Sequence, residues 1–292
     1  MSRPVLVLSA PRSYSSLFGT MLGQHPDLYG LPEVKLFLAD TVGSLITRFQ
    51  WAHVQRLHGL YRVIGQIEFG GQTDETVRQA KAWLNARRSW TTERMWTHLA
   101  QAAAPQALLE AAPVTAMFPG SLQRARRICP EARYIHLTRH PGPSCASIQA
   151  SLRWLDKRYH TPLRFFVDPE KVWRRAHRNI CAFVATLPED RVLRLRGEDL
   201  MADAPAVLDR VTAFLGLAMD AAALEAMLHP EHSIYAHEGP PLAPMGSDPK
   251  FLADPTFRPS PVTLVPLSET KSPKGRPLAP ETLRVAKQIG YD

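Results

Sequence analysis

Cysteine is scarce in this 292-residue chain, which contains only Cys129, Cys145 and Cys181. Their spacing includes no Cys-x-x-Cys pair, and this argues against a structural zinc site. An odd number of widely spaced cysteines predicts reduced, mostly buried thiols in a reducing compartment.

Long apolar runs are also missing. The first apolar run covers only residues 5–8, and no later stretch approaches the roughly 18 apolar residues of a membrane-spanning helix. A run this short does not make a signal peptide either. We therefore expect a soluble, cytoplasmic protein without stable membrane insertion.

The composition is that of an ordinary globular protein, with 45% hydrophobic and 21% charged residues. The net charge of +8 suits an anionic ligand, which includes nucleotides, nucleic acids and membrane surfaces. Because the arginines are scattered and no nucleic-acid-binding motif is present, we expect no nucleic-acid partner.

Segments typical of strands alternate with helical patterns. Strands are predicted at residues 5–8, 132–138 and 191–195, and helices at 16–24, 121–128, 143–156, 171–187, 206–217, 221–228 and 281–289. This alternation predicts an α/β fold, a three-layer sandwich with a mainly parallel sheet. No internal repeat is visible, so we expect a single domain over residues 1–292.

Two segments differ from this pattern. Residues 42–104 are predominantly helical, with predicted helices at 75–85 and 92–103, and they carry the aromatic residues Trp51, Phe69, Trp83, Trp90 and Trp96. Residues 239–280 are crowded with proline, which predicts a long loop or extended arm. Loops of this length in compact domains are usually functional lids or disordered.

Residues 10–16, Ala-Pro-Arg-Ser-Tyr-Ser-Ser, lie between a predicted buried strand and a helix. Amide groups and the dipole at a helix N-terminus attract anions. Arg12 adds a permanent charge, and the hydroxyls of Ser13, Ser15 and Ser16 can donate to phosphate oxygens. The alternative is that a serine here merely caps the helix. The segment lacks the GxxxxGK[ST] pattern, so we expect no bound metal.

This segment resembles the 5′-phosphosulfate-binding loop of the sulfotransferase superfamily, in the branch that has Arg instead of Lys. Residues 24–33 are similar to that branch as well. The resemblance implies a P-loop nucleotide-kinase-like core and 3′-phosphoadenosine 5′-phosphosulfate (PAPS) as sulfuryl donor. It also implies that the donor is bound by Arg12, Ser13, Tyr14, Ser15 and Ser16.

Glu33 follows Arg12 by 21 positions. In the family that the chain resembles, a Glu in this place is the catalytic base that accepts the acceptor hydroxyl's proton. From the residues alone, a surface or helix-capping side chain is the favoured interpretation of Glu33, and His25 and His53 are weaker candidates for the base.

Arg139 ends the predicted strand at 132–138, and Ser147 lies eight residues later on the next helix. The pair can hold one phosphate by charge and hydrogen bond, and it resembles the family's 3′-phosphate-binding segment. Two anion sites fit a nucleotide with phosphates at both its 3′ and 5′ positions. Residues 197–200, Gly-Glu-Asp-Leu, resemble the family's Tyr-Glu-Asp-Leu segment, with Gly197 in place of Tyr.

Two departures from the family's pattern stand out. Tyr14 occupies a position where many relatives have Gly, which makes the loop's backbone less free. Ala111 lies where relatives commonly have a Lys that helps neutralise the transferring group. The candidate replacements are Arg124, Arg126, Arg127 and Lys250, each of which is alternatively a solvated charge.

The resemblance implies an enzyme that moves a sulfuryl group from PAPS to an acceptor hydroxyl by in-line displacement. Arg12 would stabilise the leaving phosphate. The alternative is a non-catalytic protein of the same fold that binds PAPS or adenosine 3′,5′-bisphosphate. We expect residues 42–104 and 239–280 to enclose a small-molecule or lipid- or polyketide-like acceptor, with glycans and phenols also open.

Overall fold

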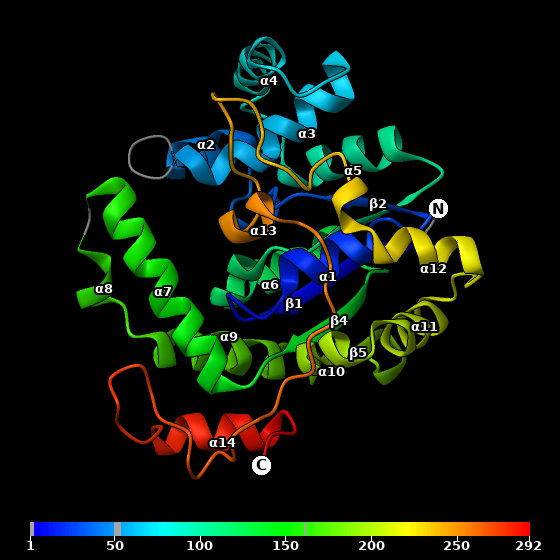
Figure 1. Ribbon diagram of the computed structural model, residues 1–292. Coiled ribbons are helices and arrows are strands. Elements are labelled where there is room, and N and C mark those ends of the chain that lie inside the picture. The colour runs from blue at the N-terminus through cyan, green and yellow to red at the C-terminus, as the bar shows by residue number, and fades with distance from the viewer. Residues whose placement is uncertain (1–2, 50–53, 161) are drawn as a thin grey trace.

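The computed structural model describes residues 3–49, 54–160 and 162–292 (Figure 1). In this part of the chain, five parallel strands form one sheet in the order β2-β3-β1-β4-β5. The strands are β1 (Val5–Ser9), β2 (Leu28–Leu31), β3 (Ala107–Glu110), β4 (Arg133–Thr138) and β5 (Val192–Arg196).

Helices cover both faces of the sheet, because successive side chains of a strand point to opposite faces. On β1, Val5 and Val7 contact one buried cluster, while Leu6 and Leu8 contact the other. The first face is covered by α1 (Ser15–Leu22), α10 (Gly197–Ala202), α11 (Ala204–Leu215) and α12 (Ala221–Leu228). The second is covered by α6 (Pro119–Ile128), α7 (Pro141–Tyr159), α9 (Pro169–Val184) and α14 (Pro280–Gln288).

The segment 42–104 is largely helical, as predicted. It contains α2 (Val42–Phe49), α3 (His58–Phe69), α4 (Asp74–Ala86) and α5 (Thr92–Ala103). Trp51 and His53 lie outside the described residues. Two short helices complete the fold, α8 (Leu163–Phe166) and α13 (Pro249–Ala253).

The proline-rich arm, residues 239–280, runs along the outside of the molecule. In Figure 1 it passes from the neighbourhood of α3 across α1 and down to α14, with α13 on the way. Leu267 and Leu278 are each 4% exposed, so parts of the arm are packed against the body.

The predicted α/β sandwich with a parallel sheet is confirmed. The sequence did not predict two of its strands, β2 and β3. Both are only four residues long, and their sequences, Leu-Tyr-Gly-Leu and Ala-Leu-Leu-Glu, contain no β-branched residue. Intrinsic preference therefore does not favour a strand at either place, and pairing with a parallel neighbour overrides it. Close packing of α1 on β2 depends on glycine, because a Cβ on Gly30 would lie 2.9 Å from the Gly23 Cα.

None of the described helices is both long and apolar enough to cross a membrane. Cys129, Cys145 and Cys181 are free and buried, as the sequence predicts.

Candidate active site

The loop that joins β1 to α1, residues 10–14, has an unusual backbone. Arg12 and Tyr14 adopt positive φ angles of 67° and 62°, which are rare for residues other than glycine. Tyr14 is the N-cap of α1, and no side chain caps this helix end. The amide groups of the first turn therefore lack protein partners within the helix and face outward, as an anion site requires.

The serines of this segment occupy different positions. The side chain of Ser13 is fully buried, and its hydroxyl has no hydrogen-bond partner among the described residues. Ser15 and Ser16, in the first turn of α1, line two adjacent clefts. We name the two clefts after the ligands expected from the sequence. The cleft called the donor cleft is lined by Arg12, Tyr14, Arg139, Asp248 and Lys250. The cleft called the acceptor cleft is lined by Leu31, Pro32, Glu33, Ala111, Ser233 and Tyr235.

Arg12, Arg139 and Ser147 converge although they come from three different elements. Arg12 Nε donates a hydrogen bond to Ser147 Oγ at 2.9 Å, and Arg139 Nη1 donates to the Arg12 carbonyl at 2.8 Å. Burial, followed by the charge of Arg139, lowers the pKa of Arg12 to about 10, so its guanidinium remains charged at neutral pH. Two arginines and a hydroxyl are thus concentrated beside the uncapped end of α1.

Tyr14 and Gly197 are in close contact and are sterically complementary. The Arg139 guanidinium carbon lies 4.1 Å from the centre of the Tyr14 ring, a cation–π contact. A Cβ on Gly197 would lie 2.5 Å from Tyr14 Cδ2, so the ring fits only against a glycine. The two departures from the family's pattern at these positions therefore form one complementary contact.

Glu198, the next residue, supports the turn that follows Arg139. Its carboxylate accepts hydrogen bonds from the His140 amide and the Tyr291 hydroxyl, each at 2.8 Å. Glu198 is 6% exposed, and this buried network fixes the end of β4 where Arg139 leaves the sheet.

Glu33 is held by residues distant in the sequence. Its amide donates to the Gly246 carbonyl at 2.8 Å, and Gly59 on α3 packs so tightly that a Cβ there would lie 2.4 Å from the Glu33 carbonyl oxygen. Its carboxylate forms an ion pair with Lys35, with Glu33 Oε2 at 2.9 Å from Lys35 Nζ. Glu33 thus lies at the acceptor cleft, across Ser15 and Ser16 from the donor cleft.

The arm contributes a carboxylate to the donor cleft. Asp248 forms an ion pair with Arg12, and its amide donates to Ser16 Oγ at 3.3 Å. Its side chain also caps α13 by accepting from the Lys250 amide at 2.9 Å. An anionic group of the protein itself therefore contacts the arginine that the sequence assigns to an anionic ligand.

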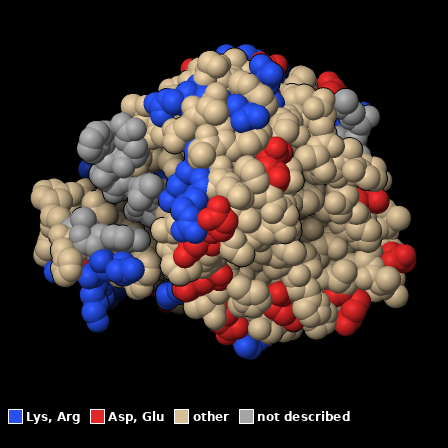
Figure 2. All heavy atoms as spheres, turned by 90° about the horizontal axis from the view of Figure 1, so that it is seen from above, with Lys and Arg blue, Asp and Glu red and all other residues tan. Residues whose placement is uncertain are grey.

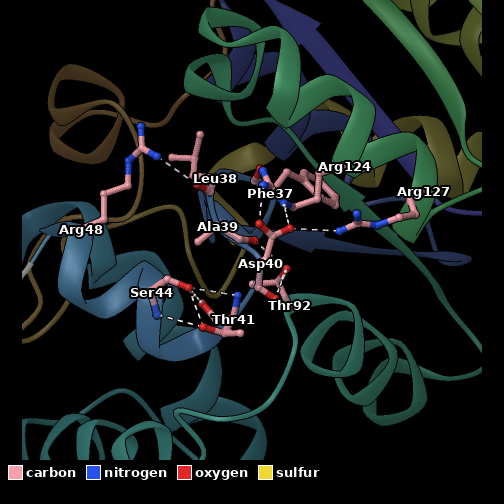
Figure 3. A network of polar contacts seen from close by, with 10 residues as sticks. All are labelled: Phe37, Leu38, Ala39, Asp40, Thr41, Ser44, Arg48, Thr92, Arg124 and Arg127. Carbon is pink, nitrogen blue, oxygen red and sulfur yellow. Dashed lines mark hydrogen bonds and ion pairs between the residues drawn. The ribbon is translucent and has the colours of Figure 1, made fainter.

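Three of the four candidate replacements for the missing lysine are engaged elsewhere. Figure 3 shows Arg124 and Arg127 directed at Asp40, with nitrogen–oxygen distances of 2.7 and 3.1 Å. Their hydrogen bonds, with Arg124 first, lower the pKa of Asp40 to about 2. Arg126 donates to Thr186 at 3.3 Å. Lys250 is the candidate that lines the donor cleft.

His25 and three of the tryptophans singled out in the sequence make contacts that stabilise the fold and do not line either cleft. His25 is 2% exposed and bonds the Ala218 carbonyl at 2.8 Å. Trp83 and Trp90 pack edge to face with ring centres 5.5 Å apart, and Trp96 lies 5.2 Å from Phe37. Trp96 is part of the buried cluster on the second face of the sheet, and Trp83 and Trp90 pack against that cluster.

Two residues at or next to the acceptor cleft carry no sequence signal. Tyr235 lines the cleft, 206 positions from Tyr29, and the hydroxyls of the two tyrosines are 2.9 Å apart. Lys35 does not line the cleft but contacts Glu33, which does, and no motif identifies it in the sequence.

A possible metal-binding group within the described residues consists of His229, Glu231 and His232. His229 already bonds the carboxylates of Glu231 and Glu225, at 2.8 and 3.1 Å, and these bonds raise its pKa. The group does not line the donor or the acceptor cleft. On the face in Figure 2, Lys and Arg form small groups interspersed with Asp, Glu and uncharged surface.

The family profile and the similar solved structures found by comparison with known proteins are all sulfotransferases. The profile described as "Sulfotransferase family" matches residues 4–221. The chain is similar to the sulfotransferase domain from the curacin biosynthetic pathway, at 25% identity and a TM-score of 0.82, covering 100% of this chain and 99% of that one. It is also similar to the sulfotransferase domain of the Synechococcus PCC 7002 olefin synthase, at 27% identity and a TM-score of 0.73, covering 100% and 97%. No curated protein matches significantly.

Proposed function

This chain belongs to the sulfotransferase family, and we propose that it transfers a sulfuryl group from PAPS to an acceptor hydroxyl by in-line displacement. The observation that carries the proposal is the convergence of Arg12, Arg139 and Ser147 beside the uncapped N-terminus of α1. Such an arrangement suits a ligand with two separate phosphate-like groups.

The residues of the donor cleft fit the proposed donor. The first turn of α1, with Ser13, Tyr14, Ser15 and Ser16, would hold the 5′-phosphosulfate. Arg139 and Ser147 would hold the 3′-phosphate. The fit is supported by two buried polar groups without partners in the described structure, Ser13 Oγ and Arg139 Nε, because such groups normally have one.

In the proposed reaction, Glu33 accepts the proton of the acceptor hydroxyl. The acceptor oxygen bonds to sulfur as the bond between sulfur and the 5′-phosphate oxygen breaks, and that oxygen keeps the electron pair. Arg12 balances the charge on the departing phosphate. By analogy with phosphoryl transfer, catalysis rests on positioning and charge stabilisation, and no step requires a metal or a covalent intermediate.

We propose an acceptor hydroxyl on a lipid- or polyketide-like chain. The similarity to sulfotransferase domains of a curacin pathway and an olefin synthase, at 25% and 27% identity over the whole chain, supports this class. The helical segment 42–104 and the arm 239–280 would enclose the acceptor. Both touch Glu33, through Gly59 on α3 and Gly246 in the arm.

The second candidate function is nucleotide binding without transfer, and it is favoured by Ala111, which offers no cation at the acceptor cleft. The two functions share the donor site and differ in turnover. A screen with PAPS and hydroxyacyl thioesters, alkyl alcohols and phenols separates them, because only the enzyme releases adenosine 3′,5′-bisphosphate together with a sulfated product.

The first test is calorimetric titration with adenosine 3′,5′-bisphosphate, with ATP and 5′-AMP as comparison ligands. We expect selective micromolar binding of the bisphosphate. Arg139→Ala should weaken it by about 10- to 150-fold, the effect of removing hydrogen bonds to a charged group worth about 1.5–3 kcal/mol. The exposed Arg178→Ala serves as control and should leave binding unchanged. Equal binding of ATP and the bisphosphate, or no binding, would overturn the proposal.

A further inference from the structure

Lys35 is a buried lysine with one evident charged partner. The residue is 7% exposed, and its ammonium nitrogen lies 2.9 Å from Glu33 Oε2. Lysine is rarely buried, because taking its charge out of water is costly unless the charge is paired. Glu33 lines the acceptor cleft and its side chain is 20% exposed, whereas the side chain of Lys35 is 8% exposed. Lys35 therefore supports Glu33 from the more buried side.

The backbone at Lys35 is held in place to make this contact. Lys35 has a φ of 59° and a ψ of 24°, a left-handed conformation that is uncommon for residues other than glycine, aspartate and asparagine. Its amide donates to Glu110 Oε1 at 3.1 Å, and Glu110 is 3% exposed. A strained residue that its surroundings hold in position is a pointer to function.

Glu110 itself does not supply the negative charge that Lys35 needs. Glu110 accepts from the Lys35 amide, whereas the Lys35 ammonium pairs with Glu33. Burial, the largest cause, raises the pKa of Glu110 to about 8 and so favours its neutral form. The carboxylate in contact with the Lys35 ammonium is that of Glu33. Ala111, on another wall of the same cleft, adds no charge.

The proposed donor gives this pairing a purpose. PAPS carries several negative charges, and its phosphosulfate would lie across Ser15 and Ser16 from Glu33. A nearby negative charge repels a carboxylate from the cleft. A cation in direct contact with Glu33 offsets this repulsion without occupying the space of donor or acceptor.

Resting on the proposed function, we propose that Lys35 is the positioning residue of the transfer site, whose ammonium holds the Glu33 carboxylate directed into the acceptor cleft while the donor is bound. Glu33 receives the proton from the acceptor hydroxyl, and Lys35 gives up none of its own. It acts through Glu33 and not on the donor, so its loss should change the rate and leave nucleotide affinity intact.

The test compares Lys35→Met and Lys35→Arg in single turnovers of PAPS with excess enzyme, using the acceptor found by screening, or water if none is found. Lys35→Met should lower the rate about tenfold or more, since small misplacements of a catalytic group have effects of this order. Its Kd for adenosine 3′,5′-bisphosphate should stay within about twofold of the wild type. Lys35→Arg should restore most of the rate. The exposed Lys171→Met is the matched control and should not change it.

A double mutant separates a positioning role from a merely structural one. In the Glu33→Gln background, Lys35→Met should have no further effect, because residues that act as a unit are not additive. A full rate in Lys35→Met, or the same loss with and without Glu33, would overturn the inference. If Lys35→Met does not fold, the comparison is made with Lys35→Gln, checked by thermal unfolding. Failure of the wild type to bind the bisphosphate would instead overturn the proposed function.

Discussion

The donor and acceptor sides of this site are built in different ways. Arg12 and Arg139 follow β1 and β4, which are neighbours in the sheet, so the parallel strands deliver both to the same edge. Glu33 follows the edge strand β2 and is held by groups from α3 and from the arm, at Gly59 and Gly246. The donor side thus depends on the sheet, and the acceptor side on contacts between distant segments.

This difference implies a division of roles. Ligands of parallel α/β sheets bind at the carboxyl ends of the strands, where backbone and charge are fixed by the fold itself. A helical segment and an arm packed around such a platform can vary without disturbing it. We therefore expect substitutions on the donor side to change nucleotide affinity, and substitutions on the acceptor side to change turnover.

The largest expected effect is a loss of turnover caused by a substitution on the acceptor side alone. Glu33→Gln should lower turnover of PAPS by about 100-fold or more, because general-base catalysis contributes at least this much. The substitution keeps the shape of the side chain and removes its ability to accept a proton. Single-turnover kinetics measure the loss, and calorimetry should find unchanged affinity for adenosine 3′,5′-bisphosphate. Turnover within about threefold of the wild type would show that Glu33 is not the base.

An intermediate effect is expected on the donor side. Gly197→Ala introduces a methyl group 2.5 Å from Tyr14 Cδ2, which must displace the ring that contacts Arg139. Overpacking of this kind costs about 1–3 kcal/mol, and we expect nucleotide affinity to fall about tenfold with little change in the maximal rate.

The partner substitution sharpens this test. In a Tyr14→Gly background, Gly197→Ala meets no ring, and only the Thr138 carbonyl oxygen remains close, at 3.3 Å. Its effect on affinity and on thermal stability should therefore be much smaller than in the wild type. Tyr14→Gly alone relieves a left-handed backbone but releases Arg139, so it should stabilise the loop while weakening nucleotide binding. If the two substitutions are additive, Gly197→Ala does not act through the Tyr14 ring.

The two sides also differ in how far the sequence predicts them. Arg12 and Arg139 each follow a strand with a clear hydrophobic pattern, and Ser147 lies on the helix after Arg139. The proximity of these residues in the structure follows from parallel strand order. The significance of Gly197 is not visible in the sequence. Its need for space arises from the Tyr14 ring, which lies 183 residues earlier.

The acceptor side is less predictable because its supports are not local. Lys35 contacts Glu33, but its role depends on Glu110, a residue on the unpredicted strand β3. Arg124 and Arg127 are plausible site cations by position in the sequence, yet both are bound to Asp40 (Figure 3). The sequence does not show which carboxylate each of these cations contacts in the folded chain. It therefore could not distinguish Arg124 and Arg127 from Lys35.

The smallest expected effect lies where the two sides meet, at the ion pair of Asp248 in the arm with Arg12 in the donor loop. An anionic donor competes with this carboxylate for Arg12, so Asp248→Asn should raise affinity for adenosine 3′,5′-bisphosphate. Because such pairs are worth about 0.2–1 kcal/mol, the gain should be at most about fivefold, and it should shrink at high salt. Asn can still accept a hydrogen bond at the N-terminus of α13, so the arm should stay folded. Weaker binding in calorimetry would mean that Asp248 instead holds Arg12 in the geometry that the nucleotide needs, and the arm would then belong to the donor side.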